Sequence, residues 1–184
     1  LNLIYCKNKQ NIIGYDNNLL FTIREDMKYF KKITTQEYIL NQRNVVIMGY
    51  NTWKSIPEKF RPLQDRLNIV ITTNHYNDLK DEYGEILVFK TFEDCYKFLE
   101  KEENNNNMLG NKFIIGGGQL YNHIFSNYLM VIDKIYETIV NYNLIKSEHT
   151  HYTSLNHHID LYPELDFNIE KFTDKFISIN KKYC

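Results

Sequence analysis

The sequence has 184 residues, a length that suits one compact domain with a sizeable core. Hydrophobic residues make up 43% and aromatic residues 15%, which excludes a disordered chain. The 22 basic and 23 acidic residues give a formal net charge of −1, so charge does not favour general binding to nucleic acid or to membrane surfaces.

Short apolar runs alternate with helix-like patterns along the chain, which is typical of an α/β architecture. Their nearly continuous hydrophobicity favours interior strands that are covered on both faces. The predicted strands are residues 3–6, 45–48, 68–72, 86–89, 113–115 and 132–139.

Two predicted helices carry start signals. Thr22 has Glu25 three positions after it, the spacing of a capping box, and Thr91 with Asp94 forms a weaker version. A short helix at residues 52–57 is expected to end at its proline.

Asp26 projects from the apolar face of the first predicted helix, because Ile23 lies three residues before it and Phe30 four residues after it. A carboxylate there is costly to bury unless it is hydrogen-bonded. Two interpretations stay open, an aspartate at the helix edge that turns to water or a pocket carboxylate that binds the N–H groups of a ligand.

Residues 113–121 predict a strand, three glycines and a helix start. Glycines there let a phosphate approach backbone N–H groups and the positive end of the helix dipole. Tyr121 stands where the dinucleotide fingerprint GxGxxG needs its last glycine, and the Gly-Lys-Ser/Thr of a P-loop is missing. A plain tight turn is therefore an alternative.

Further candidates lie near the strand at residues 45–48. Gly49, Thr52 and Ser55 come just after it, where open α/β sheets bind their ligands. Arg66 suits a bidentate pair with a carboxylate, although a single arginine is more often a surface residue.

Cysteines and histidines indicate no further site. Three scattered cysteines at positions 6, 95 and 184 indicate reduced thiols, and with no secretory signal at the N-terminus we expect a cytoplasmic protein. His149, His151, His157 and His158 have spacings that metals use, but no ordered partner ligands accompany them. We expect a polar loop there and no metal.

Three ordered segments together resemble dihydrofolate reductase, over residues 1 to about 138. They read DMKYF at 26–30, VIMGYNTWKSIPEKFRPLQDRLN at 46–68, and IGGG at 115–118. The resemblance implies a single α/β domain over residues 1–184, with a central, mostly parallel twisted sheet of about eight strands. It also implies an antiparallel C-terminal strand and about four flanking helices.

In activity, the resemblance implies an oxidoreductase that reduces 7,8-dihydrofolate to 5,6,7,8-tetrahydrofolate with NADPH and so supports one-carbon metabolism and thymidylate synthesis. NADH is not excluded. It further implies inhibition by antifolates, no nucleic-acid or membrane partner, and room for a fused or associated thymidylate synthase, since the chain begins with Leu1 inside a strand pattern. Two alternatives stay open, a same-fold reductase acting on another pterin or pyrimidine, and a degenerate domain that binds folate or nucleotide without efficient turnover.

On the substrate side, the resemblance makes Asp26 the catalytic carboxylate that binds the pterin ring, so that N5 accepts a proton. Thr138 supports this carboxylate, and Phe21 is the aromatic wall of a mobile loop. Arg66 binds the α-carboxylate of the glutamate tail. The other substrate residues that the resemblance implies are Ile4, Tyr5, Cys6, Met27, Phe30, Ser55, Ile56, Leu63 and Ile115.

On the cofactor side, the resemblance implies a glycine cradle for the diphosphate, with a cis peptide bond between Gly116 and Gly117 and with Tyr121 facing the nicotinamide. The residues that it implies for NADPH are Cys6, Ile13, Leu19, Gly49, Tyr50, Asn51, Thr52, Thr72, Thr73, Ile115, Gly116, Gly117, Gly118, Gln119, Leu120 and Tyr121.

The mobile loop and the tail depart from the family pattern. Leu20-Phe21 replaces Pro-Trp in the loop, and Ile12 and Asn17 replace glycines, so that Ile12 requires a different loop path whereas Asn17 tolerates a left-handed backbone. In the tail, residues 161–164 (LYPE) are interpreted as the displaced remnant of a family motif.

The positions that bind the 2′-phosphate of NADPH in the family carry no full positive charge here. They are occupied by Tyr50-Asn51, Thr73-Asn74 and Gln119, and His75 is the nearest candidate cation. We expect NADPH to be preferred over NADH, with weakened discrimination between the two.

Overall fold

The computed structural model describes residues 1–36, 42–82, 84–105, 109–142, 152–155, 166–173 and 176–182. These fall into two compact units, unit 1 with Leu1–Phe30 and Gly118–Cys184, and unit 2 with Lys31–Gly117. The four histidines between positions 149 and 158 and the residues 161–164 lie outside the described part. No helix within the described ranges is long and apolar enough to span a membrane.

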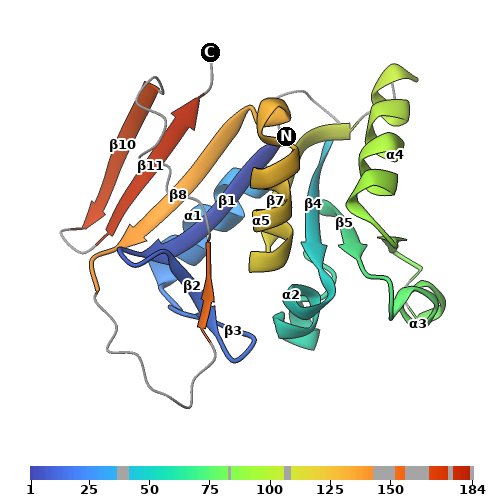
Figure 1. The fold of residues 1–184 in the computed structure, drawn as a ribbon, viewed down its shortest axis with the longest axis horizontal. Helices are drawn as coiled ribbons and strands as arrows, with labels where there is room; N and C mark the ends of the chain where they lie inside the picture. The colour runs from blue at the N-terminus through green and yellow to red at the C-terminus, as the bar shows by residue number, and fades with distance from the viewer. Residues whose placement is uncertain are drawn as a thin grey trace. The chain divides into compact units, whose positions relative to one another are not determined.

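Four strands of unit 1 are hydrogen-bonded side by side, and the first strand of the chain is one of them (Figure 1). The strand order is β10 (Asp166–Thr173), β11 (Phe176–Lys182), β8 (Lys134–Val140) and β1 (Asn2–Asn8). β1 and β8 run parallel, β11 is antiparallel to β8, and β10 is antiparallel to β11. The strands predicted at 3–6 and 132–139 and the antiparallel C-terminal strand are confirmed.

A second, antiparallel sheet in unit 1 was not predicted. Its order is β3 (Asn18–Leu19), β2 (Ile12–Tyr15) and β9 (Tyr152–Ser154). Ile12 is fully buried, and the register of β2 against β9 shifts between Ile12 and Gly14. This irregular pairing accommodates a side chain where glycine was expected. Asn17 has φ 60°, the left-handed conformation that asparagine tolerates.

Helices cover the strands of unit 1. α5 (Gly118–Asn127) lies in front of β1 in Figure 1, and Tyr5 of β1 meets its Tyr121 edge-on, with 5.4 Å between ring centroids. A short 3-10 helix, η2 (Leu129–Val131), follows. α1 (Arg24–Thr35) contains the boundary between the units, and it begins two residues after the predicted cap, Thr22.

Unit 2 is built on four parallel strands. Their order is β7 (Leu109–Gly116), β4 (Arg43–Gly49), β5 (Arg66–Ile71) and β6 (Ile86–Phe89). The central run at residues 45–48 is fully buried, as expected for a parallel strand covered on both faces. All four strands predicted in this unit are confirmed, and so is the mostly parallel α/β fold class.

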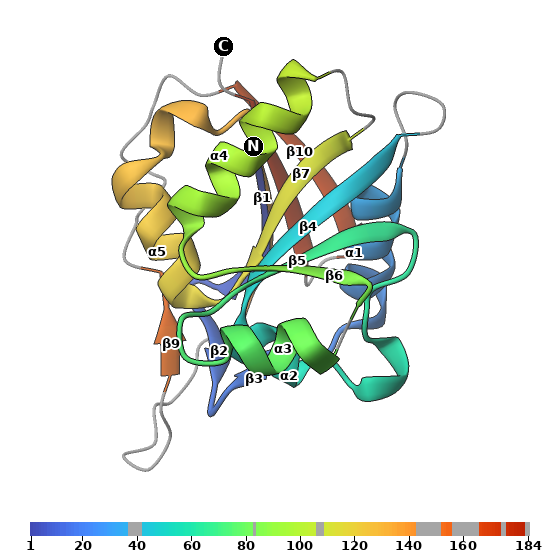
Figure 2. The ribbon, with the colours of Figure 1, turned by 90° about the vertical axis from the view of Figure 1, so that its right-hand side faces the viewer.

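The helices of unit 2 lie along the sheet and beyond the carboxyl ends of its strands (Figure 2). Thr91 caps α4 as predicted: its hydroxyl accepts a hydrogen bond from the Asp94 N–H at 3.1 Å. The predicted short helix is present, and its Trp53 is fully buried. The helices are α2 (Tyr50–Ser55), η1 (Glu58–Phe60), α3 (Tyr76–Glu82) and α4 (Phe92–Asn104).

An ion pair is buried between the parallel strands of unit 1. The Lys7 ammonium lies 2.7 Å from the Glu137 carboxylate, and these side chains are 9% and 2% exposed. Tyr5 is paired with Glu137 in register, so Lys7, two residues further along β1, lies on the same face of the sheet. Removing one partner would leave the other charge buried without compensation.

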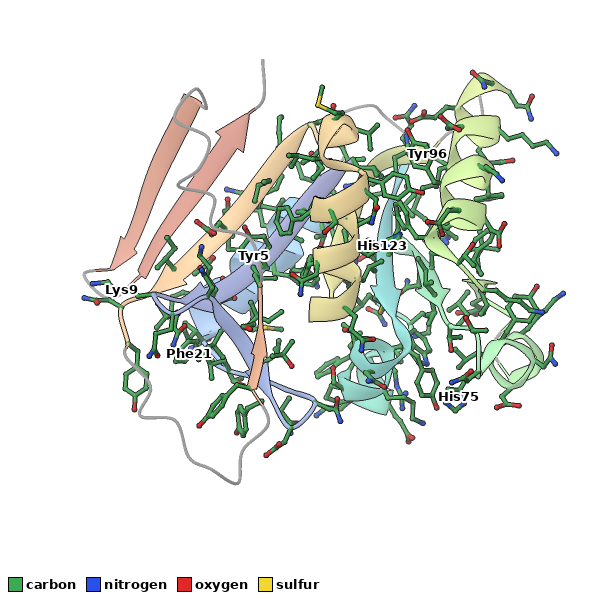
Figure 3. The ribbon with its side chains drawn as sticks, in the orientation of Figure 1. Tyr5, Lys9, Phe21, His75, Tyr96 and His123 are labelled. Atoms are coloured by element: carbon green, nitrogen blue, oxygen red, sulfur yellow. The ribbon has the colours of Figure 1, made fainter. Side chains whose placement is uncertain are left out.

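We therefore expect Lys7→Met to lower the free energy of unfolding by about 3–5 kcal/mol. The double variant Lys7→Met/Glu137→Leu should recover most of this loss, because neither charge is then buried. Lys9, which is exposed and labelled in Figure 3, provides the control: Lys9→Met should stay within about 0.5 kcal/mol of wild type. Urea unfolding of the four proteins measures these differences, and equal stability of Lys7→Met and Lys9→Met would contradict the prediction.

Candidate functional site

Asp26 is half-buried in the first turn of α1. Burial raises the pKa of its carboxyl group, and a hydrogen bond donated by the Thr138 hydroxyl partly offsets this rise. The carboxylate is thus withdrawn from water but supported by a donor, which favours the pocket carboxylate over an aspartate that turns to solvent.

The parallel register of β1 and β8 gathers other side chains near this carboxylate. Cys6 is paired with Thr138, and Ile4 with Tyr136. Burial and the negative charge of Asp26 raise the pKa of the Cys6 thiol far above its ordinary range. Cys6 therefore stays protonated beside Asp26 and adds no second charge.

Tyr121 ties α5 to β1. Its hydroxyl donates a 2.7 Å hydrogen bond to the Ile4 carbonyl, and the side chain is buried. Burial, with the charge of Asp26 and the Cys6 thiol adding to it, raises the pKa of Tyr121 well above its ordinary value. Asp26, Cys6, Ile4, Tyr121 and Thr138 thus form one cluster in unit 1, in which the Asp26 carboxyl group loses its proton at lower pH than the Cys6 thiol or the Tyr121 hydroxyl.

The segment before α1 brings two predicted cofactor residues together. A Cβ built on Gly118 would lie 3.7 Å from Ile13 Cδ1 and only 2.4 Å from Thr153 Cγ2, so a side chain does not fit at this glycine. Phe21, labelled in Figure 3, meets the ring of Tyr142 edge-on at 6.0 Å. No sequence motif predicts this contact with Tyr142.

In unit 2, three of the glycines predicted for the cofactor, Gly49, Gly116 and Gly117, lie near one another. The peptide bond between Gly116 and Gly117 is cis, as predicted. A Cβ on Gly117 would lie 3.1 Å from Thr52 Oγ1, and a Cβ on Gly49 would lie 3.9 Å from the Gly116 carbonyl oxygen and the Gly117 nitrogen. A Cβ at Gly117 would therefore crowd the Thr52 hydroxyl, whereas one at Gly49 would make only an ordinary van der Waals contact.

Arg66 is buried, so its interpretation as a surface arginine is wrong. Its guanidinium donates to the Thr34 hydroxyl at 2.8 Å and to the Gln64 carbonyl at 2.9 Å. Burial lowers the pKa of Arg66, and the charge of Asp65 opposes this. Thr34 is a partner that no sequence motif indicated, since the contact joins residues 32 positions apart.

The loop before β5 is held by Asn68. Its side-chain amide accepts from the Leu63 N–H at 2.9 Å and donates to the Leu63 carbonyl at 2.8 Å. Ser55 donates its hydroxyl to the Thr52 carbonyl at 2.7 Å. These bonds fix the half-buried Leu63 and close the end of α2, near the half-buried Ile56.

The remaining predicted residues differ in exposure. Among the described residues, no three His, Cys, Asp or Glu side chains gather in a group that could hold a metal. Of the site residues predicted from the sequence and not yet described, those that are buried or half-buried are Tyr5, Phe30, Tyr50, Thr72, Ile115 and Leu120. Those that are exposed are Leu19, Met27, Asn51, Thr73 and Gln119.

Comparison with known proteins gives consistent matches. The dihydrofolate reductase family model matches residues 1–159. The dihydrofolate reductase of Candida albicans is 38% identical over 118 residues, covering 64% of this chain and 57% of its own. That of Saccharomyces cerevisiae is 33% identical over 125 residues, covering 67% and 58%.

A third relative is longer. The bifunctional dihydrofolate reductase-thymidylate synthase of Acanthamoeba polyphaga mimivirus is 32% identical over 149 residues, which cover 77% of this chain and 24% of the relative. The chain spans a little under six tenths of the two fungal enzymes. With the family model matching most of its residues, this chain belongs to the dihydrofolate reductase family.

Proposed function

We propose that this protein reduces 7,8-dihydrofolate to 5,6,7,8-tetrahydrofolate with NADPH as the hydride donor. The observation that carries the proposal is the half-buried Asp26 carboxylate with the Thr138 hydroxyl bound to it. A half-buried carboxylate that already accepts a hydrogen bond from a hydroxyl suits the paired N–H donors of a pterin ring.

In the proposed reaction, Asp26 accepts hydrogen bonds from the 2-amino group and the N3 side of the pterin. This polarises the ring so that N5 takes a proton from water. Thr138 holds the carboxylate in place, while Cys6 and Tyr121 remain protonated and leave Asp26 as the charge that the ring meets.

NADPH, when bound, supplies the hydride that reduces C6. Gly49, Thr52, Gly116 and Gly117 are proposed to hold its diphosphate in unit 2, and the proximity of these residues supports this. Tyr121 is proposed to lie beside the nicotinamide.

Arg66 supports folate over other pterins and pyrimidines as the substrate. A guanidinium held by Thr34 and Gln64 is preorganised, so it loses little freedom when it binds the carboxylate of a glutamate tail. A reductase for a substrate without this tail would not need the buried charge.

The wider role follows from the reaction. Tetrahydrofolate supports one-carbon metabolism and thymidylate synthesis, and we propose that residues 1–184 act as one cytoplasmic reductase domain that antifolates inhibit. A fused or associated thymidylate synthase is proposed as a partner, supported by the name of the bifunctional mimivirus relative.

Asp26→Asn should lower kcat/KM for dihydrofolate by about 10²- to 10⁴-fold, because the amide cannot polarise the ring as the carboxylate does. Glu25→Gln, an exposed neighbour on the same helix, should leave the rate unchanged. A spectrophotometric assay of hydride transfer measures both. Absence of turnover by the wild-type protein at any pH would refute the proposed function, and equal rates for wild type and Asp26→Asn would remove Asp26 from its role.

The stability of the ligand-free protein should depend on pH through Asp26. Its pKa is raised above the ordinary value of 3.8, so the folded state holds this proton at pH values where the unfolded chain has lost it. The free energy of unfolding should therefore fall as pH rises from about 3.8 through the raised pKa.

Asp26→Asn removes this contribution, so its stability relative to wild type should increase with pH over that window. Thr138→Val should extend the window upward, because it removes the bond that lowers the pKa. Urea unfolding at several pH values measures both effects, with Glu25→Gln as the control. A pH-independent difference between wild type and Asp26→Asn would contradict this account.

NADPH should support a higher kcat/KM than NADH by about tenfold, the contribution of one hydrogen bond to a charged group. The margin should be modest, because Thr73 and Tyr50 replace the basic side chains of the family pattern. Steady-state rates with each cofactor measure it, and a preference of several thousandfold would show that the phosphate is bound by more charge than these positions carry.

A further inference from the structure

The side-chain amide of Asn44 joins the end of α1 to two strands of unit 2. Its Nδ2 donates to the Thr34 carbonyl at 3.1 Å and to the Gln36 carbonyl at 2.9 Å, which uses both N–H donors of the amide. Its Oδ1 accepts from the Asn111 N–H of β7 at 2.8 Å. Asn44 is 2% exposed, so its amide depends on these partners instead of on water.

The helix end that Asn44 binds is also the place where Arg66 finds an acceptor. Asn44 and Arg66 are paired in register on the parallel strands β4 and β5, so their side chains lie on the same face of the sheet. Asn44 binds the Thr34 carbonyl, whereas the Arg66 guanidinium donates to the Thr34 hydroxyl at 2.8 Å. Two neighbouring side chains therefore hold one fully buried threonine, and the position of its hydroxyl depends on both.

An irregularity of the sheet fixes the amide of Asn44 from the other side. The register of β4 against β7 shifts between Arg43 and Val45, so that Gly110 and Asn111 both fall opposite Asn44. The Asn111 N–H then donates to the side chain of Asn44. A Cβ on Gly110 would lie 2.4 Å from Asn44 Oδ1, so a side chain at this glycine would displace the amide.

Stabilisation of the helix end is the alternative role for Asn44. The last carbonyls of a helix lack partners within the helix, and an amide that binds two carbonyls at this end stabilises it whatever else the helix does. The shared Thr34 favours a second role. Arg66 is a buried charge, and the direction of its guanidinium follows from the hydroxyl that it binds.

We propose that Asn44 is a positioning residue for Arg66: by fixing the end of α1, it orients the guanidinium for the carboxylate of the glutamate tail. This rests on the proposed function, because Arg66 binds that tail only if folate is the substrate. Asn44 acts through Thr34 and not by touching the substrate. Affinity for the glutamate tail is thereby linked to the irregular pairing of β4 with β7.

Binding of two ligands that differ in the tail tests the proposal without any turnover. Isothermal titration calorimetry of the full chain compares folate with pteroate, which lacks the glutamate. Asn44→Ala should weaken folate about tenfold, because the guanidinium is displaced, and should change pteroate less than about twofold. Leu99→Ala, which removes a buried side chain of α4 in the same unit, is the control for a general loss of stability and should change neither.

Two further variants separate positioning from stabilisation. Gly110→Ala displaces the amide of Asn44 without removing any of its hydrogen-bonding groups, and it should also weaken folate more than pteroate. In an Arg66→Leu background, Asn44→Ala should cause no further loss of folate affinity, because no guanidinium remains to be oriented. A purely structural role would give the same loss in both backgrounds.

Thr34 provides a conservative pair. Thr34→Val removes the hydroxyl that Arg66 binds and should weaken folate as Asn44→Ala does, whereas Thr34→Ser keeps the hydroxyl and should retain wild-type affinity. Thermal unfolding of each variant checks that unit 2 is folded at the temperature of the titration.

Several outcomes would overturn the proposal. Asn44→Ala that weakens both ligands equally, or neither, would leave Asn44 as a helix-end residue, and wild-type protein that binds folate no tighter than pteroate would remove Arg66 from the tail. The proposed function fails separately: a protein that shows these binding differences but does not reduce dihydrofolate would keep the role of Asn44 and lose the reaction. Active protein whose folate binding ignores Asn44 would do the reverse.

Discussion

Parallel pairing of β1 with β8 sets the position of the polar groups in unit 1. It places Cys6 beside Thr138 and Tyr5 beside Glu137, so one face supplies the donor for Asp26 and the opposite face buries the Lys7–Glu137 ion pair. A one-residue slip would exchange the two faces and leave Asp26 without Thr138. Stability and the proposed chemistry therefore depend on the same register of β1 and β8. The Lys7–Glu137 ion pair favours this register, because a slip would separate the two charges.

In unit 2, the parallel strands position the backbone of glycine residues, whereas in unit 1 they position charged side chains. The parallel strands of unit 2 end together, so a Cβ built on Gly49 would lie within van der Waals distance of the Gly116–Gly117 peptide. The proposed glycine cradle depends on missing side chains, whereas the stack of the Tyr50 and His75 rings, with 3.9 Å between centroids, depends on large ones. Neighbouring strand ends thus differ in what they present, glycine backbone at one and stacked aromatic rings at the other.

The features predicted correctly from the sequence are those that depend on residues close together in the chain. Apolar runs revealed the buried strands, and the Thr91 cap was readable because its partner is three residues away. β2, β3 and β9 were missed because they are only two to four residues long and all three include exposed positions. The contacts of Arg66 with Thr34 and of Tyr50 with His75 carry no sequence signal, because they depend on which strands are neighbours.

Trp53 gives the protein an unusual optical property. It is the single tryptophan of the sequence, and the family pattern's second indole is replaced by Phe21. Its ring is fully buried in unit 2, with the Arg61 guanidinium 5.5 Å from its centroid and Thr52 of the glycine cradle next to it in the chain. Tryptophan emission therefore has one source, in α2, and its wavelength and quenching report on that helix, without a contribution from the loop at Phe21.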